Sequence, residues 1–470
     1  MHLRFLTARG AATAGLIATL GVGAALPAAA DPVTHFTLDN GLEVVVIEDA
    51  RAPAVTHMLW VRAGAADEPP GQSGIAHFLE HLMFKGTETR APGEFSAVVE
   101  SVGGRDNAFT SWDFTAYHQR VHADYLGLMM EMEADRLANL SFTEAEWIPE
   151  RDVILEERGE VVESRPGSLF NEQMRAALFR HHPYGTPIIG WRHEMETLTG
   201  DQAMEFFASH YGPNNAVLIV AGGITAEEVR ELAEIHYGPL DANPAITERV
   251  RLSEPPHLAE RRIEMEDPRV AQPYVLRQYI APARRAGDQA EAAALTVLAE
   301  ILGGSSTTSV LARELTLGSD PVALSASAFY MSLALDDTTF GLAVVPADDV
   351  TLAEVEAALD DALARFMEDG VDPEQFARVQ TRIKAAEVFG RDRIDSRARQ
   401  MGMALTTGLS VADVEGWTDA LMAVTPEDVM AAAEAVFDRR AAVTGWLTGP
   451  EDAPRRPGGG VEPPMMEVSQ

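Results

Sequence analysis

The segment from His77 to His81 reads His-Phe-Leu-Glu-His and combines side chains that can hold and use a metal ion. In a helix, His77 and His81 lie on one face, one turn apart, so both imidazoles can bind one tetrahedral zinc ion. Glu80 projects near this face, where a carboxylate that is not a ligand can take a proton from zinc-activated water. The H-x-x-E-H order therefore predicts a zinc hydrolase of the inverzincin type. The alternative is an amphipathic helix whose histidines only cap or pack.

Composition narrows the classes of function that remain. The 470 residues allow two to three domains, and the net charge of -35 argues against nucleic acid and anionic membranes as partners. The chain has no cysteine, which excludes disulfides, Cys-ligated zinc and a thiolate nucleophile. Any metal must therefore be held by His, Asp or Glu.

Hydrophobic periodicity predicts two runs of alternating strands and helices. Asn40-Gly41 predicts a hairpin turn, and Ser73 is a candidate helix N-cap. In the first run we expect strands over 35–38, 42–47, 55–63, 108–121 and 216–221, and helices over 73–84, 124–139 and 145–163. In the second we expect strands over 275–280, 322–330 and 339–345, and helices over 290–302, 352–367 and 373–388. The similar element order suggests a duplicated unit.

The boundaries of these units follow from breaks in the pattern. A charge-rich stretch with prolines begins near Leu240 and ends near Arg262, and we place domains over 31–245 and 263–449 with a linker over 246–262. Residues 1–30 resemble a secretory signal with cleavage after Ala30, which predicts a periplasmic or secreted protein; a retained membrane anchor is the alternative. Residues 450–470 are rich in Pro and Gly and are predicted to be disordered.

The run from Ser73 to Thr87 closely resembles the pitrilysin, or M16, metallopeptidase family, which includes insulin-degrading enzyme and the mitochondrial processing peptidase. The resemblance implies a zinc cofactor and a third ligand 76 residues after His81, which is Glu157. Its neighbour Glu156 would point about 100° away on the same helix. Glu150 matches a family carboxylate that supports catalysis. Without the family, Glu150 could equally be a solvated carboxylate at a helix start.

A second match, from Gly103 to Ser111, resembles the family's edge strand that pairs with the substrate backbone. It implies that Asn107 and Ala108 bind substrate, although Asn107 alone would be read as a turn residue. The resemblance covers nearly the whole mature chain. It implies an α+β fold of two homologous sandwich halves, each a mostly antiparallel sheet with helices packed on one face, as in LuxS-like metallohydrolases. The N-terminal domain would be catalytic and the C-terminal one inactive.

The C-terminal half departs from the family pattern at two positions. Active members present an Arg and a Tyr seven residues apart, and here Thr316 and Leu324 stand near those places, with Arg313 and Tyr330 out of register. A sister subunit could donate the pair, so a heterodimer is expected before a homodimer. His118 and His122 lie far apart if their segment is a strand. The remaining candidates, His181, His182 and His193, are expected to be surface or loop residues.

Two other functions share features of this sequence. A ribosyl-homocysteine lyase also carries an H-x-x-E-H helix but depends on Cys, which this chain lacks. A catalytically silent scaffold or peptide-binding subunit is the remaining alternative. The expected function is a zinc metalloendopeptidase that hydrolyses peptides or unfolded polypeptides, with no nucleic acid partner and no membrane span after signal cleavage.

Overall fold

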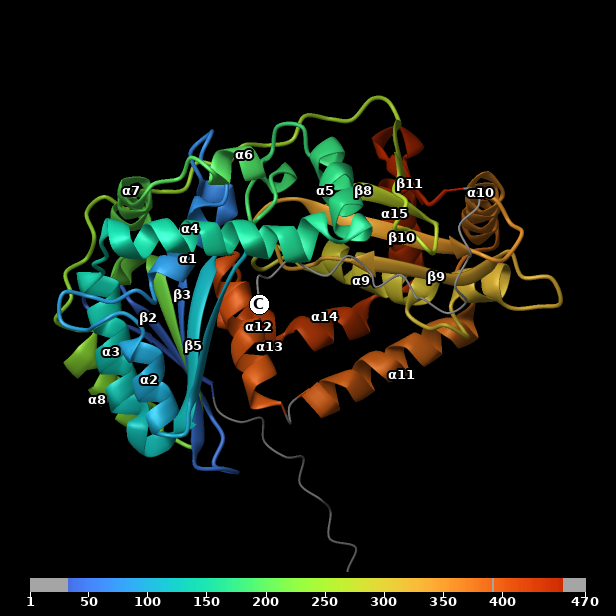
Figure 1. The fold of residues 1–470 in the computed structure, drawn as a ribbon. Helices are drawn as coiled ribbons and strands as arrows, with labels where there is room; N and C mark the ends of the chain where they lie inside the picture. Colours follow the sequence, from blue (N-terminus) through green and yellow to red (C-terminus); the bar gives the residue numbers. More distant parts are fainter. Residues whose placement is uncertain (1–32, 391–392, 451–470) are drawn as a thin grey trace, which may run out of the picture.

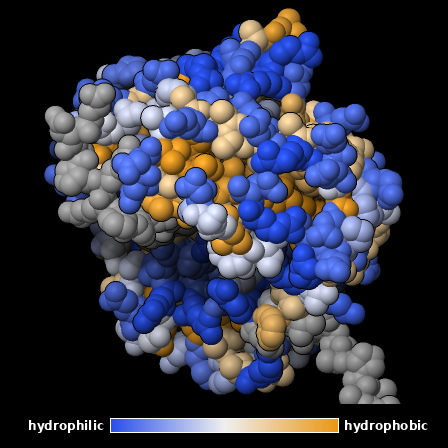
Figure 2. Space-filling model, turned by 90° about the vertical axis from the view of Figure 1, so that its right-hand side faces the viewer, coloured by the Kyte–Doolittle hydropathy of each residue, from blue (hydrophilic) through white to orange (hydrophobic). Residues whose placement is uncertain are grey.

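The computed structural model describes residues 33–390 and 393–450, arranged around two β-sheets that lie side by side (Figure 1). The predicted signal segment and the predicted disordered tail, apart from residue 450, lie outside the described residues. Within the described residues, no helix combines the length and the apolar character needed to cross a membrane. The end of the molecule formed by the C-terminal half shows an apolar area framed by hydrophilic surface, above a hydrophilic hollow (Figure 2).

The first half holds a six-stranded sheet. Its strands are β1 (Val33–Thr37), β2 (Glu43–Glu48), β3 (Ala54–Val61), β4 (Arg105–Thr110), β5 (Thr115–His122) and β6 (Ala216–Gly222), in the order β1-β2-β6-β3-β5-β4. Its helices are α1 (Ile75–Leu82), α2 (Glu94–Ser101), α3 (Leu126–Asn139), α4 (Glu144–Arg158), α5 (Pro166–Leu178), α6 (Arg192–Met195), α7 (Gly200–His210) and α8 (Ala226–His236).

The second half holds a five-stranded sheet. Its strands are β7 (Arg261–Glu266), β8 (Tyr274–Ala281), β9 (Ala323–Tyr330), β10 (Thr338–Pro346) and β11 (Val443–Thr448), in the order β7-β11-β8-β10-β9. Its helices are α9 (Ala290–Gly303), α10 (Leu352–Asp369), α11 (Pro373–Gly390), α12 (Ile394–Thr406), α13 (Val411–Glu415), α14 (Trp417–Ala423) and α15 (Pro426–Val436).

The two sheets share one topology. If β1 is set aside, the strands of each half follow the same spatial order, β2-β6-β3-β5-β4 in the first and β7-β11-β8-β10-β9 in the second. In both, the first pair is parallel and the other three are antiparallel. The predicted fold class of two related, mostly antiparallel halves is therefore confirmed.

Two local predictions were wrong. The strand expected over 108–121 is a hairpin, because the chain turns between Ser111 and Phe114 and forms β4 and β5. Ser73 does not cap α1, because its hydroxyl instead accepts a hydrogen bond from the Trp191 N–H at 2.9 Å. The cap is Gly74, with a φ of 87° that glycine adopts without a Cβ clash. The N–H groups of Gly74 and Ala76 donate to the Glu68 carboxylate at 3.0 Å.

Each half contributes one helix to the other half's sheet. Helix α4 crosses the first half and leads into α5, which packs on the second sheet through Phe170, Met174 and Leu178 against residues of β8, β10 and β11 (Figure 1). In return, α12 packs on the first sheet through Ala398, Met401 and Leu405, against a cluster that includes Trp60. The two halves are therefore joined by the hydrophobic packing of α5 and α12 on the opposite sheets, as well as by the linker.

At each of these two helix–sheet contacts, a glycine allows the helix to approach the sheet closely. A Cβ on Gly402 of α12 would lie 2.0 Å from Trp60 of β3, and a Cβ on Gly445 of β11 would lie 2.2 Å from the sulfur of Met174. Real atoms do not approach so closely, so any larger residue would push the helix away from the sheet.

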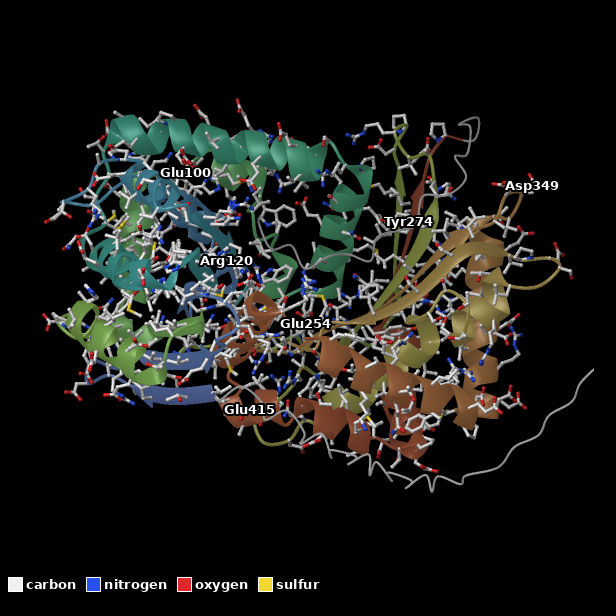
Figure 3. The ribbon with its side chains drawn as sticks, turned by 90° about the horizontal axis from the view of Figure 1, so that it is seen from below. Glu100, Arg120, Glu254, Tyr274, Asp349 and Glu415 are labelled. Carbon is white, nitrogen blue, oxygen red and sulfur yellow. The ribbon has the colours of Figure 1, made fainter. Side chains whose placement is uncertain are left out.

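The linker is tied to both halves by charged contacts. The Arg251 guanidinium donates to Asp113 and to Asp336, each at 2.6 Å, and these two carboxylates belong to the first and the second half. Glu254 lies between the halves and accepts the N–H groups of His181 and His182 at 2.8 and 3.0 Å (Figure 3). The irregular stretch predicted as a linker thus lies along the junction with fixed partners.

We predict that Gly402→Ala lowers the free energy of unfolding by about 1–3 kcal/mol, because overpacking against Trp60 outweighs the better helix propensity of Ala. Urea unfolding measures the change. The matched control is Gly167→Ala in α5, where the added Cβ meets only the Tyr274 hydroxyl at 3.6 Å and stability should hold or rise. Equal stability of Gly402→Ala and wild type would contradict the close packing of α12.

Candidate metal centre

Helices α1 and α4 bring three candidate ligands together. His77 and His81 project from α1 with their ring centroids 4.8 Å apart, and Glu157 projects from α4. Glu157 Oε2 lies 3.6 Å from His77 Nε2 and 3.4 Å from His81 Nε2. A tetrahedral zinc ion with bonds of about 2.0 Å separates its ligand atoms by about 3.3 Å. Both distances to Glu157 are close to this value, and the ligand atoms of all three residues lie within 4.8 Å of one another. Among the described residues, these three alone form such a group.

The chemistry of His77 supports a bound cation. Its side chain is fully buried, and within the described part of the chain neither ring nitrogen has a hydrogen-bond partner. An unpaired buried polar group costs about 1–3 kcal/mol, and a metal ion at Nε2 would remove part of this cost. Burial also lowers the pKa of His77 to about 3. The imidazole is therefore neutral, as a metal ligand must be.

Glu150 acts on His81 from the other side of the ring. Its Oε1 lies 2.9 Å from His81 Nδ1, and Lys85 Nζ lies 2.5 Å from its Oε2. Burial alone would lower the pKa of His81, but hydrogen bonds to Glu150 and Glu157 raise it to about 9. The carboxylates therefore favour a positive charge at this imidazole, which a cation bound at Nε2 would supply in place of the proton. A carboxylate on Nδ1 also leaves Nε2 directed at Glu157, which is the usual support for a metal-bound histidine.

Glu80 lies beside the ligands but is not one of them. Its carboxylate is buried, and Thr110 Oγ1 in β4 donates a hydrogen bond to Oε2 at 2.5 Å. Thr110 lies beyond Ala108 on the same face of the strand, so the strand predicted to bind substrate also orients the predicted base. Thr110 lies in the run from Gly103 to Ser111 that resembles the family, but no role was predicted for it. The two-residue alternation of β4 was the signal that could have identified it.

The predicted substrate-binding residues lie on an outer strand. Among the described residues β4 pairs only with β5, so its other edge has no strand beside it. Asn107 is opposite His118, and its Oδ1 accepts the Ala108 N–H at 2.9 Å. Ala108 lies in the core cluster around α1, whereas Phe109 lies in the cluster around α12. Successive residues of β4 therefore face the metal centre and the exchanged helix in turn.

Other sequence candidates lie away from the three ligands. Glu156 is exposed on α4, while His118 and His122 belong to β5. His182 Nε2 contacts Asp336 at 3.1 Å, and His193 is exposed. At the two positions predicted to depart from the family pattern, the Thr316 hydroxyl donates to the Ala312 carbonyl, and Leu324 is about half-exposed.

Two family models match the chain. Residues 43–191 match the family model described as Insulinase (Peptidase family M16), and residues 197–383 match the Peptidase M16 inactive domain. The chain belongs to peptidase family M16. The M16 resemblance read from the sequence is thus confirmed.

Two relatives resemble the chain in sequence over part of their length. It is 32% identical over 231 residues to the probable mitochondrial-processing peptidase subunit beta of Arabidopsis thaliana, covering 49% of this chain and 43% of that protein. It is 32% identical over 219 residues to zinc protease PqqE of Helicobacter pylori, covering 46% and 49%. The matches thus span about half the length of these relatives.

Among solved structures, a protease from Helicobacter pylori superimposes with a TM-score of 0.81 at 24% identity, covering 89% of this chain and 100% of that one. The periplasmic protease PqqL from Escherichia coli gives a TM-score of 0.78 at 22% identity, covering 88% of this chain and 47% of that one. These likenesses show that the M16 protein shares its two-half fold with known proteases.

We predict that Glu150→Ala weakens zinc binding about 10- to 100-fold, because His81 loses the acceptor that orients its ring. Competition with a chromophoric chelator measures the zinc affinity. Glu156→Ala is the matched control, since Glu156 lies on the same helix and is exposed. Equal affinity in the two variants would show that Glu150 does not support the metal centre.

Proposed function

We propose that this M16 protein is a zinc-dependent endopeptidase that hydrolyses peptides or unfolded polypeptides. The observation that carries the proposal is the convergence of His77, His81 and Glu157, with ligand atoms within 4.8 Å of one another, beside the buried carboxylate of Glu80. Relatives named zinc proteases support both the metal and the class of reaction. We assign catalysis to residues 31–245 and a supporting role to the inactive domain over 263–449.

The residues of the site have different roles in the proposed reaction. Zinc bound by His77, His81 and Glu157 would supply a Lewis acid that polarises the peptide carbonyl and lowers the pKa of the attacking water. Glu80 accepts the proton of that water and donates it to the nitrogen of the leaving group. The hydrogen bond from Thr110 holds the Glu80 carboxylate in one orientation during both transfers. Glu150 keeps His81 oriented through Nδ1.

The substrate class follows from the edge of β4. A peptide that adds to an exposed strand must be extended, and its main-chain groups make the hydrogen bonds. Folded proteins rarely offer such a segment, whereas unfolded polypeptides do. The predicted signal segment at 1–30 supports export, so we place the activity in the periplasm or outside the cell.

We also propose that a second subunit completes the active site. The chain carries Thr316 and Leu324 near the places of the family's Arg and Tyr, which bind substrate and steady the tetrahedral intermediate. One relative is named as the beta subunit of a processing peptidase, which supports assembly from two M16 chains. We propose a heterodimer in which the partner provides the Arg and the Tyr.

The base is tested by Glu80→Gln. Cleavage of an unstructured fluorogenic peptide should fall at least about 100-fold, because a Gln amide cannot accept the proton, while the bound zinc stays at the wild-type level. Glu100→Gln on α2 is the control, since Glu100 is exposed and its loss should change neither property. If the zinc-loaded wild type cuts nothing, alone or with its partner, the chain is a silent binding subunit.

The heterodimer is tested by purification from the native source under mild conditions. We expect a second M16 chain with an Arg and a Tyr seven residues apart in its C-terminal half. Adding that chain should raise peptide cleavage by the present chain, and replacing its Arg with Ala should abolish the gain. Full activity of the present chain as a homodimer or monomer would contradict the proposed division of labour.

A further inference from the structure

The face of β4 opposite the metal centre carries a second group of side chains at the substrate edge. Phe109 is buried on this face, where it contacts Trp60 and packs under α12. The guanidinium carbon of Arg399, from α12, lies 4.2 Å from the centroid of the Phe109 ring. The ring of His118, on the neighbouring strand β5, lies 6.1 Å from the same centroid. An arginine and a histidine thus flank one aromatic residue of the outer strand.

Within the described residues, the side chains of Arg399 and His118 have no polar partner. No hydrogen bond or ion pair engages the side chain of Arg399 or His118, although both are half-buried. Arg120 on the same face shows the contrast, because it pairs with Asp395 at the start of α12. Burial lowers the pKa of Arg399, and burial together with Arg399 lowers that of His118 to about 4. A partly desolvated, unpaired guanidinium is unfavourable unless an anion joins it.

The geometry of strand addition brings such an anion within reach. A peptide bound at the free edge of β4 would lie about 4.8 Å from that strand, with side chains directed alternately to the two faces of the sheet. One set would face α1, Glu80 and the ligands. The other set would face α12, where Arg399 lies directly over the edge strand. A glutamate or aspartate in this second set could reach the guanidinium, whereas a lysine or arginine there would be repelled.

We infer that Arg399, with His118 beside it, receives an acidic side chain of the bound peptide on the face of β4 opposite Glu80. This inference rests on the proposed function, because it requires a peptide at the edge of β4. It makes Arg399 a specificity-determining residue supplied by the C-terminal half. Selection by charge would occur on one face of the strand, and hydrolysis on the other.

The test measures binding separately from cleavage. The full chain with Glu80→Gln is loaded with zinc and titrated into fluorescent, unstructured peptides of Gly, Ser and Ala, in which a single Glu, Gln or Lys is moved along the sequence. Fluorescence anisotropy gives each Kd. We expect Glu to bind about tenfold tighter than Gln at one position, with Lys weaker than Gln there. Adding Arg399→Gln should remove the preference for Glu, and Arg399→Glu should reverse it in favour of Lys.

The control is Arg378→Gln, which removes an exposed arginine of α11 and should leave the preference unchanged. If peptides bind but Glu, Gln and Lys are equivalent at every position, the inference is overturned while the proposed function stands. The same holds if the preference survives Arg399→Glu with wild-type thermal stability. If no peptide binds to any variant, the proposed function itself fails.

Discussion

His77 has no exposure to solvent and, among the described residues, no hydrogen-bond partner, and this constraint organises the metal centre. A neutral imidazole can be held in this state only because α1 is packed between the sheet and α4. The same packing sets Glu157 Oε2 within 3.6 Å of both imidazoles. A cation bound at His77 Nε2 would give one of its two unpaired ring nitrogens a partner and balance the negative charge of Glu157 and Glu150. Small shifts of α1 or α4 would therefore cost both metal affinity and stability.

The position of α1 is fixed by residues that do not belong to the candidate metal centre. Its first turn is held by the Glu68 carboxylate, and Ser73 ties the preceding loop to Trp191. The sheet beneath it is packed on its far face by α12, which comes from the second half and approaches Trp60 through Gly402. The C-terminal half is thus a structural part of the half that holds the candidate metal centre, and each sheet is covered partly by a helix of the other half.

Much of the site could be predicted because its parts are local. The spacing of His77, Glu80 and His81 places them on one helix without any knowledge of the fold, and the family register selects Glu157 over Glu156. The hairpin at Ser111–Phe114 was missed because it contains no glycine, proline or Asn-Gly turn signal. The role of α12 was missed because its buried positions, Ala398, Met401 and Leu405, face a sheet distant in sequence. A periodic pattern can indicate an apolar helix face but does not identify its partner.

The outer strand β4 connects these observations. Thr110 on one face contacts Glu80, and Phe109 on the other lies under Arg399, so neighbouring residues of one strand serve two different environments. Because side chains alternate strictly along a strand, a bound peptide would be exposed to both environments at once. Acceptance of one side chain by α12 would then fix which peptide bond lies opposite Glu80. The exchanged helix would in this way couple the second half to the register of cleavage, even though that half carries no second H-x-x-E-H segment.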